Sequence, residues 1–297
     1  MLAHLNRLRW MSALQLFGFL MLFWIGLTHT GCFTMRTPDR KWPQEMVEQG
    51  QIRPIHMFDA EGTDGRTIHA VAIGLCDSLP VVVGVHGSPG SSSAFADYLA
   101  DTILTARAGF IAIDRPGFGY SDFGHPETSL QKQALDIKAL LDEGVPGRKV
   151  ILVGHSLGGP LIVRFAMDHP EMVSGLVIVA GSVDPDLEPH PWWQKPLDHW
   201  PLKWLIPRSM RTSNHEIIGL EAELRSMLPL WPSIHCPVRI LHATDDRLVP
   251  FANSAFAEEH LTGVLDLKLD TMHQGDHFIL WNHRKRVVDA ILDLASP

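Results

Sequence analysis

The sequence predicts an α/β fold in which a mainly parallel central sheet is covered by helices on both faces. After about residue 80, short apolar runs alternate with amphipathic helical patterns, as expected for strands joined by helical crossovers. The chain has 297 residues, of which 45% are hydrophobic, so it can bury a full core in one large domain. These two observations predict one core domain that spans most of the chain.

The strands of this sheet are predicted from their apolar character. Apolar, β-branched runs that read as buried strands occupy residues 81–85, 110–113, 150–153, 176–180, 238–242 and 264–269. Residues 54–58 and 67–73 precede them and are separated by the turn-forming residues 61–65. This pair is predicted to be an antiparallel hairpin at the sheet edge. An amphipathic pattern around residues 287–292 predicts a final helix.

Ser156 lies in the motif Gly154-His155-Ser156-Leu157-Gly158, between the strand at 150–153 and apolar residues at helical spacing over 161–166. A serine at the tip of a strand-to-helix turn and flanked by glycines is a nucleophile elbow. The strained turn needs small neighbours, and the following helix points its N–H groups toward the reacting atom. We therefore predict that Ser156 is the nucleophile. The alternative is a glycine-rich turn that holds a solvated serine.

Four segments of the sequence resemble the α/β-hydrolase family. Three of them are the Ser156 motif, His86-Gly87-Ser88-Pro89-Gly90 after one strand, and Asp114-Arg115-Pro116-Gly117-Phe118-Gly119-Tyr120-Ser121 after the next. The fourth combines Asp246-Arg247-Leu248-Val249-Pro250 with Gly275-Asp276-His277-Phe278. The resemblance runs from about residue 54 to the C-terminus, with an interruption, and implies the α/β-hydrolase fold. It leaves the reaction open, because one fold hosts many chemistries.

The resemblance also implies an oxyanion hole, which stabilises the tetrahedral intermediate of acyl transfer with two backbone N–H groups. In this family one donor belongs to the residue after the nucleophile, here Leu157. The other belongs to the loop after the third strand, here Ser88. We expect His86 to hold this loop by hydrogen bonding rather than to act as a base. Residues 114–119 are expected to build a structural loop without a role in the chemistry.

His277 is the predicted general base. Histidine has an unperturbed pKa of about 6.5, which suits proton transfer at neutral pH. His277 lies between the last predicted strand and the final helix, where the family places its histidine. His273 and His283 are nearby alternatives. The spacing of His273 and His277 also fits a metal pair, but Gly275 disfavours the helix that such a pair needs, and we expect no metal and no cofactor.

Asp246 is the predicted acid that orients His277. It lies four residues before Pro250, as the acid does in this family, although Ala243 stands where the family usually has glycine. Asp184, just after the preceding strand, is the alternative because some relatives carry the acid there. The chain order of Ser156, Asp246 and His277 is the order found in α/β hydrolases.

Residues 183–235 differ in composition from the core segments 54–182 and 236–297. The stretch contains five tryptophans and eight prolines, and one clear helix is predicted over residues 216–228. In this family an insertion at this point forms a cap over the active site. We expect the tryptophans to line or support an apolar acyl pocket, the alternative being that they only pack the cap onto the core.

The first 35 residues are predicted to be a signal or membrane-anchor segment, followed by a tether over residues 36–53. Arg7 and Arg9 precede 19 uncharged residues, a length at the border between a signal peptide and a spanning helix. Cys32 follows Gly31, as at a bacterial lipoprotein cleavage site, and is a candidate for lipidation. An uncleaved anchor with an incidental cysteine is the alternative. Either arrangement tethers the chain to a membrane with its catalytic domain on the extracytoplasmic side.

Charge and cysteine content exclude some other functions. After the first 35 residues the chain has 23 basic and 33 acidic residues, a net charge of −10. An acidic domain without a basic stripe argues against a nucleic-acid partner and against strong attraction to anionic lipid. Cys76 and Cys236 lie at predicted strand ends, and we predict no required disulfide.

Together these features predict a membrane-tethered serine hydrolase, similar to carboxylesterases, that cleaves ester or other acyl bonds of small to medium apolar substrates. A carbon–carbon bond hydrolase and a cofactor-free haloperoxidase or perhydrolase are alternatives, because both kinds of relative use the same three residues. A silent ligand-binding protein on the same fold is the alternative outside the enzymes.

Overall fold

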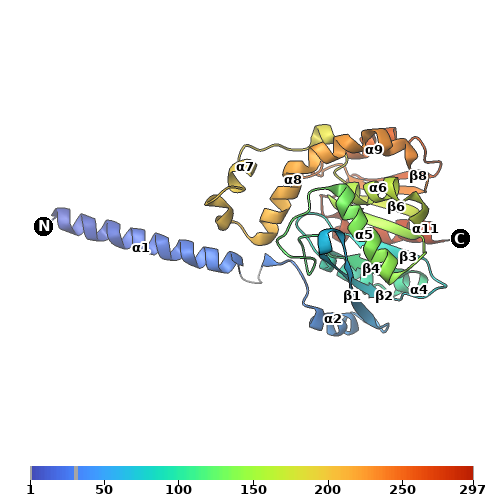
Figure 1. Cartoon of the computed structure of the whole chain (residues 1–297), viewed down its shortest axis with the longest axis horizontal. Coiled ribbons are helices and arrows are strands. Elements are labelled where there is room, and N and C mark those ends of the chain that lie inside the picture. Colours follow the sequence, from blue (N-terminus) through green and yellow to red (C-terminus); the bar gives the residue numbers. More distant parts are fainter. Residues whose placement is uncertain (1, 30–32, 297) are drawn as a thin grey trace.

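The computed structural model of the chain describes residues 2–29 and 33–296 (Figure 1). At its centre lies an eight-stranded sheet in the order β1-β2-β4-β3-β5-β6-β7-β8. The strands are β1 (Ile55–Glu61), β2 (Thr67–Ile73), β3 (Val81–Val85), β4 (Gly109–Ile113), β5 (Val150–His155), β6 (Val173–Val179), β7 (Val238–Ala243) and β8 (Leu267–Met272). The predicted α/β-hydrolase fold is confirmed, and so is the N-terminal hairpin at the sheet edge. β1 pairs antiparallel with β2 and β2 pairs antiparallel with β4, whereas the other neighbours are parallel.

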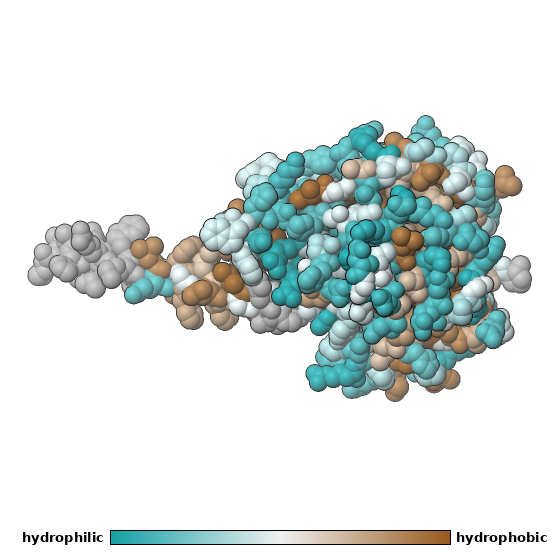
Figure 2. Space-filling view, in the orientation of Figure 1, coloured by the Kyte–Doolittle hydropathy of each residue, from teal (hydrophilic) through white to brown (hydrophobic). Residues whose placement is uncertain are grey.

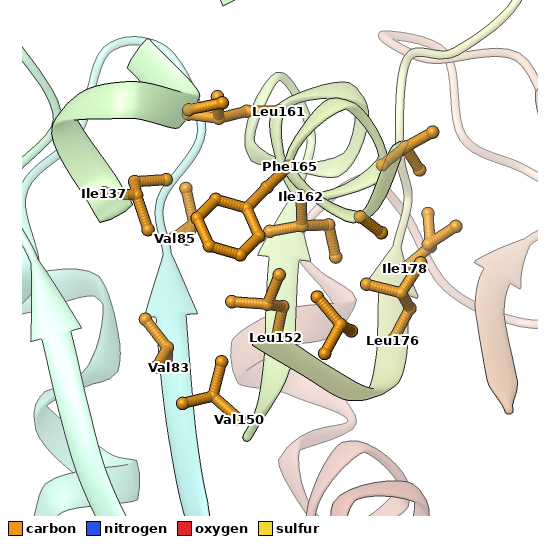
Figure 3. Packing of buried hydrophobic residues seen from close by; sticks show 14 of the residues in the cluster. Val83, Val85, Ile137, Val150, Leu152, Leu161, Ile162, Phe165, Leu176 and Ile178 are labelled. Carbon is orange, nitrogen blue, oxygen red and sulfur yellow. The ribbon is translucent and has the colours of Figure 1, made fainter. Parts of the chain in front are cut away.

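Helices cover both faces of this sheet, because strands buried on both sides present apolar side chains in both directions. One hydrophobic cluster joins the sheet to α5 (Leu130–Gly144), α6 (Gly158–Asp168) and α9 (Ala252–His260). Figure 3 shows Leu161, Ile162 and Phe165 of α6 packed on side chains of β3, β5 and β6. The other cluster joins the opposite face to α2 (Trp42–Glu48), α3 (Ala96–Leu99), α4 (Thr102–Arg107), α10 (Ile279–Asn282) and α11 (Arg284–Ala295).

Short 3-10 helices complete the connections. They are η2 (Asp39–Lys41), η3 (Thr63–Gly65), η4 (Ser92–Phe95), η5 (Pro170–Met172), η6 (Pro185–Leu187), η7 (Leu202–Leu205) and η8 (Leu228–Ser233). The last three, with α7 (Gln194–Leu197) and α8 (Arg208–Met227), belong to the long connection between β6 and β7. This connection contains residues 183–235, which we call the cap segment; its separation as a domain stays a prediction.

The cap segment differs from its prediction in two respects. First, α8 begins at Arg208, eight residues before the predicted start, because the polar side chains of its first turns are buried and hydrogen-bonded instead of following an apolar pattern. Ser209 Oγ donates to Phe33 O at 2.7 Å, and Asn214 Nδ2 donates to Gln194 O at 3.0 Å. Second, only Trp231 is buried, while the other four tryptophans lie on the surface. They are Trp192, Trp193, Trp200 and Trp204.

The last strand begins three residues later than predicted, at Leu267. β8 pairs only with β7, and its register begins where Val238 lies beside Leu267. Pro237 precedes Val238 and has no N–H group with which to extend the ladder backwards. Val264 therefore lies in a turn before the strand, and Leu265 is fully exposed.

Helix α1 (Leu2–His29) projects away from the body of the molecule (Figure 1). From residue 14 onward most of its large apolar side chains are exposed, and Figure 2 shows hydrophobic residues gathered on this part of the helix. Across the part of the chain that the structure describes, no helix combines the length and the apolar character needed to cross a membrane. Cys32, the candidate for lipidation, lies outside the described residues.

Candidate active site

Ser156 occupies a sharp turn between β5 and α6. Its φ angle is +55°, in the left-handed region that non-glycine residues rarely adopt, and such strain costs about 1–3 kcal/mol. The Ser156 N–H donates to Val179 O at 3.0 Å, and the Gly159 N–H donates to Ser156 O at 2.8 Å. The turn is thus fixed from both sides, and the strained serine is held at the carboxyl edge of the sheet.

The glycines around Ser156 are required by close backbone approach. A Cβ atom added to Gly154 would lie 2.2 Å from Gly158 O, and one added to Gly158 would lie 2.2 Å from Val85 O. Neither contact can be relieved by a side-chain movement, since the partner atoms belong to the backbone. The predicted need for small neighbours therefore has a specific structural cause, which is the packing of the first turn of α6 on the end of β3.

His277 and Asp246 form a buried hydrogen-bonded pair. His277 Nδ1 lies 2.8 Å from Asp246 Oδ2, and the other carboxylate oxygen accepts hydrogen bonds from the N–H groups of Leu248 and Val249, both at 2.9 Å. Because the carboxylate accepts, Nδ1 carries the proton and the Nε2 lone pair is available to act as a base. The structure thus pairs an acceptor imidazole with a carboxylate, and the catalytic roles of the two residues stay a prediction.

The Asp246 carboxyl is held in its charged form. Burial alone would raise its pKa, but hydrogen bonds from His242, His277 and the Val249 amide outweigh this effect and lower it. His242 has no role among the predictions from sequence; it is buried on β7, and its Nε2 lies 3.4 Å from Asp246 Oδ2. Its Nδ1 lies 2.7 Å from Ser254 Oγ, so the ring is fixed on both sides. A histidine four residues before a predicted catalytic acid was the available signal.

His155 connects the serine turn to the His277 loop. It precedes Ser156 in the chain, and its Nε2 donates to the carbonyl oxygen of His277 at 3.0 Å. The two imidazole rings lie 4.8 Å apart, and Trp281 packs edge-on against His155. Burial lowers the pKa of His155 to about 3, so its ring stays neutral. The sequence places His155 in the motif but indicates no role for it, because its partner lies 122 residues away.

The loop after β3 lies against the serine turn. A Cβ atom added to Gly87 would be 2.9 Å from Ser156 Cβ, so the loop that carries Ser88 runs directly beside the proposed nucleophile. His86 Nδ1 donates to Gly87 O at 2.6 Å, and His86 Nε2 accepts from the Arg115 N–H at 3.0 Å. Burial and then the Arg115 charge hold the pKa of His86 well below its usual value. The neutral ring braces the loop by hydrogen bonds, in agreement with its expected role.

No hydrogen bond among the described residues joins the alternative acid or base residues to Ser156, Asp246 or His277. Asp184 accepts a hydrogen bond from the Asp186 N–H at 2.9 Å and so caps η6. His273 is exposed, and His283 Nε2 packs against Gly275. Among the described residues, no three histidine, cysteine or acidic side chains are grouped to hold a metal ion. The structure thus brings Asp246 and His277 together and places Ser88, Ser156 and Leu157 on the two adjoining turns.

Comparisons with known proteins agree with this architecture. Residues 80–205 match the family model described as the alpha/beta hydrolase fold. The mitochondrial palmitoyl-protein thioesterase ABHD10 of Mus musculus is 30% identical over 175 residues, which make up 57% of this chain and 58% of that protein. A 1-acylglycerol-3-phosphate O-acyltransferase of Arabidopsis thaliana is 31% identical over 157 residues, 50% of this chain and 36% of that protein. The chain thus spans about half the length of the curated relatives it matches.

Solved structures show the same fold. An esterase from Exiguobacterium antarcticum superposes with a TM-score of 0.63 at 20% identity, covering 80% of this chain and 99% of that one. The structure of a membrane phospholipase A covers 99% of this chain and 100% of its own, with a TM-score of 0.60 at 19% identity. The solved structures show that this chain has the α/β-hydrolase fold, and residues 80–205 are similar to the family described by that fold.

Proposed function

We propose that this chain is a serine hydrolase that cleaves ester bonds of small to medium apolar substrates through an acyl-enzyme intermediate. The observation that carries the proposal is the buried His277–Asp246 pair, in which His277 lies on a loop that contacts the serine turn through His155. A strained serine, an acceptor imidazole and an orienting carboxylate are the groups that nucleophilic acyl transfer requires. The residues proposed as catalytic are Ser156, His277 and Asp246.

In the proposed acylation step, Ser156 Oγ attacks the acyl carbon and His277 Nε2 takes the hydroxyl proton. The negative charge on the carbonyl oxygen of the tetrahedral intermediate is stabilised by the N–H groups of Ser88 and Leu157. The imidazolium is stabilised by Asp246 through the 2.8 Å hydrogen bond at Nδ1. The intermediate collapses when the bond to the leaving oxygen breaks and His277 returns the proton to the alcohol.

Deacylation repeats the same proton transfers with water. His277 removes a proton from a water molecule that attacks the acyl carbon of the Ser156 ester, and it then protonates Ser156 Oγ as the carboxylic acid leaves. No cofactor is needed in either half-reaction, because proton transfer and oxyanion stabilisation supply the chemistry.

Hydrolysis of p-nitrophenyl esters from acetyl to palmitoyl tests this proposal. The full-length chain is expected to release p-nitrophenol, and Ser156→Ala is expected to lower kcat by about 10³-fold or more while the protein stays folded. The chain length with the highest kcat/KM reports the size of the acyl pocket. If the folded wild-type protein shows no Ser156-dependent hydrolysis of any ester, the esterase proposal is wrong. Carbon–carbon bond hydrolysis or perhydrolysis would then be favoured.

Thioesters are a second candidate substrate class. The observation that favours them is the name of the relative at 30% identity, a palmitoyl-protein thioesterase. A thiolate leaves an acyl carbon more readily than an alkoxide, so the same groups catalyse both reactions. A higher kcat/KM for palmitoyl thioesters than for oxygen esters of equal chain length would assign the thioester as the preferred bond.

We further propose that the N-terminal segment tethers the chain to a membrane with the remaining residues on the extracytoplasmic side. The proposal is supported by the exposed apolar side chains of α1, among them Phe17, Phe19 and Leu22, each at least 60% exposed. Arg7 and Arg9 before this stretch favour the cytoplasmic side for the N-terminus. The tether is proposed to be either α1 itself or a lipid on Cys32, and a mass measurement on Cys32→Ser and wild-type protein separates the two.

The cap segment supports the same proposal. Trp192 and Trp200 are 84% and 77% exposed, and tryptophan favours the boundary between water and lipid. Residues 190–211 hold four basic residues and one acidic residue, whereas the whole chain has a net charge of −8. Trp24 of α1 donates from Nε1 to Leu205 O at 2.7 Å, so helix and cap segment are joined. We propose that this basic, tryptophan-rich face contacts an anionic lipid surface.

A further inference from the structure

A buried ion pair lies beneath the loop that carries Ser88, and the proposed catalytic triad does not use it. Arg115 follows β4 and is completely buried, while Glu216 on α8 of the cap segment is 2% exposed. Arg115 Nη1 donates to Glu216 Oε1 at 2.6 Å, and Nη2 donates to Glu216 Oε2 at 3.0 Å. A bidentate ion pair of this kind fixes both the orientation of the two side chains and the distance between them.

Two further hydrogen bonds from Arg115 fix the backbone of the Ser88 loop, and a third goes from Nη1 to Gln133 Oε1 at 2.9 Å. Nε donates to His86 O at 2.9 Å, and Nη2 donates to Gly87 O at 3.1 Å. In a trans peptide the C=O and N–H groups point in opposite directions. Because Arg115 and the His86 ring both hold Gly87 O, the Ser88 N–H of the same peptide is directed away from Arg115. A Cβ atom added to Gly87 would lie 2.9 Å from Ser156 Cβ, so this peptide borders the serine turn.

Glu216 extends this network to the Ser88 side chain. Ser88 Oγ donates to Glu216 Oε2 at 2.7 Å, and Gln133 Nε2 donates to Glu216 Oε1 at 3.1 Å. Each carboxylate oxygen therefore accepts one bond from Arg115 and one from a neutral side chain. Since Glu216 belongs to α8, the cap segment is connected to the Ser88 loop through a single carboxylate.

From this geometry we infer that Arg115 and Glu216 are positioning residues that aim the Ser88 N–H at the substrate oxyanion and couple the cap segment to the oxyanion hole. The inference rests on the proposed serine-hydrolase function. A shift of α8 would remove Glu216 from Arg115 and Ser88 together, and it would free the Gly87–Ser88 peptide to rotate. The oxyanion hole is therefore complete only while the cap segment is seated on the core.

Glu216→Gln and Ser88→Ala test the inference, with Glu223→Gln as the matched control. Glu223 lies on the same helix but accepts from the Leu130 N–H at 2.8 Å, outside the network. We expect Glu216→Gln to lower kcat about 10- to 100-fold with KM changed less than about threefold, because an oxyanion donor acts mainly in the transition state. Ser88→Ala removes only the hydroxyl link and is expected to lower kcat about three- to tenfold. Glu223→Gln is expected to match wild type.

Two further measurements separate positioning from a loss of folded protein. An alkylboronic acid forms a tetrahedral adduct on a serine, and its affinity is expected to fall in both variants by the same factor as kcat/KM. The affinity for the corresponding carboxylic acid is expected to stay constant. Amide hydrogen exchange in residues 84–92 is expected to speed up in Glu216→Gln, a readout that needs no enzymatic activity. If Glu216→Gln does not fold, Ser88→Ala decides the question through the same measurements.

The outcomes distinguish this inference from the proposed function. Wild-type protein without Ser156-dependent turnover, but with faster exchange of the loop in Glu216→Gln, would reject the hydrolase proposal and keep the link between cap segment and loop. A second outcome would overturn the positioning role of Arg115 and Glu216. In that outcome, Glu216→Gln and Ser88→Ala both keep the wild-type turnover, the wild-type rate of amide exchange in the loop and the wild-type affinity for the boronic acid.

Discussion

Both carboxylate oxygens of Asp246 accept hydrogen bonds, so this residue has one orientation from which it can hold His277. Asp246→Asn replaces one acceptor oxygen with an NH₂ group and disfavours the tautomer that leaves Nε2 free. We expect kcat for ester hydrolysis to fall about 10³- to 10⁴-fold, as for other triads that lose this carboxylate. Asp184→Asn is the control and should retain wild-type kcat. The reverse pattern would move the acid to Asp184.

His155 makes the stability of the protein depend on pH. Its folded pKa of about 3 lies below the unfolded value of 6.5, so below pH 6.5 the unfolded chain binds a proton that the folded chain does not. The free energy of unfolding therefore falls as pH decreases from about 6.5 toward 3. Glutamine keeps a donor for His277 O but does not titrate.

Urea unfolding at pH 4.5 and 5.5 measures this effect. Between these pH values, wild-type protein takes up about one more proton on unfolding than His155→Gln does. The slope of unfolding free energy against pH should therefore be ~1.4 kcal/mol per pH unit smaller in His155→Gln. Equal slopes in the two proteins would show that His155 is protonated in the folded state.

The residues that sequence patterns predicted are those with a local signature. Ser156 lies within its own motif, and Asp246 and His277 follow strands at positions typical of the family. His155, His242 and Glu216 act through partners that are distant in sequence or that depend on side-chain packing. Glu216 is the clearest case, because the link between Ser88 and Glu216 spans 128 residues and crosses from the core to the cap segment.

At the scale of elements, the turn from β5 into α6 depends on the glycines that allow its close packing. Gly158→Ala would place a methyl group 2.2 Å from Val85 O, and we expect it to lower the free energy of unfolding by about 3 kcal/mol or more. Gly219→Ala in α8 is the matched control, because its new methyl group would lie 3.7 Å from the nearest atom, Thr128 Cβ.

Thermal melting compares the two substitutions. The control should raise stability by up to about 1 kcal/mol, since alanine favours the helix more than glycine does. An unchanged melting temperature in Gly158→Ala would contradict the packing described for the turn.

Element boundaries were predictable where apolar periodicity determines them and wrong where hydrogen bonding does. The buried strands β3 and β5 carry continuous apolar runs, and their predicted starts at Val81 and Val150 match the structure, whereas β6 begins at Val173, three residues before its predicted start. The start of β8 follows from a proline on its neighbour, and the start of α8 follows from polar side chains that find buried partners. A single-sequence pattern contains neither kind of information, because both depend on contacts between elements.

At the scale of the whole molecule, α1 and the exposed tryptophans of the cap segment are proposed to contact the same lipid surface. Sedimentation with phosphatidylglycerol vesicles tests this arrangement on the full-length chain. We expect Trp192→Ser/Trp200→Ser to weaken vesicle binding about tenfold, ~1.4 kcal/mol, because two interfacial aromatic groups are lost. Leu265→Ser, a fully exposed residue before β8, is the control and should bind as wild type does. Equal vesicle binding by the wild type and both variants would contradict the proposed contact between the tryptophans and the lipid surface.

The role of the cap tryptophans stays a prediction. Composition predicted that they line or support an acyl pocket, or else pack the cap onto the core, and four of the five are exposed. Which face of a segment is buried follows from periodicity only in long regular elements, and residues 190–207 hold only two four-residue helices, α7 and η7, among turns and prolines.

Trapping the acyl-enzyme tests the central claim most directly. His277→Ala should still accept an acyl group slowly from an activated p-nitrophenyl ester, but it lacks the base that activates water for deacylation. Peptide mass spectrometry of this variant is expected to find one acyl group per chain, on the peptide that contains Ser156, and none when Ser156→Ala is added. An acyl group on another residue, or no adduct in folded protein, would contradict nucleophilic catalysis by Ser156.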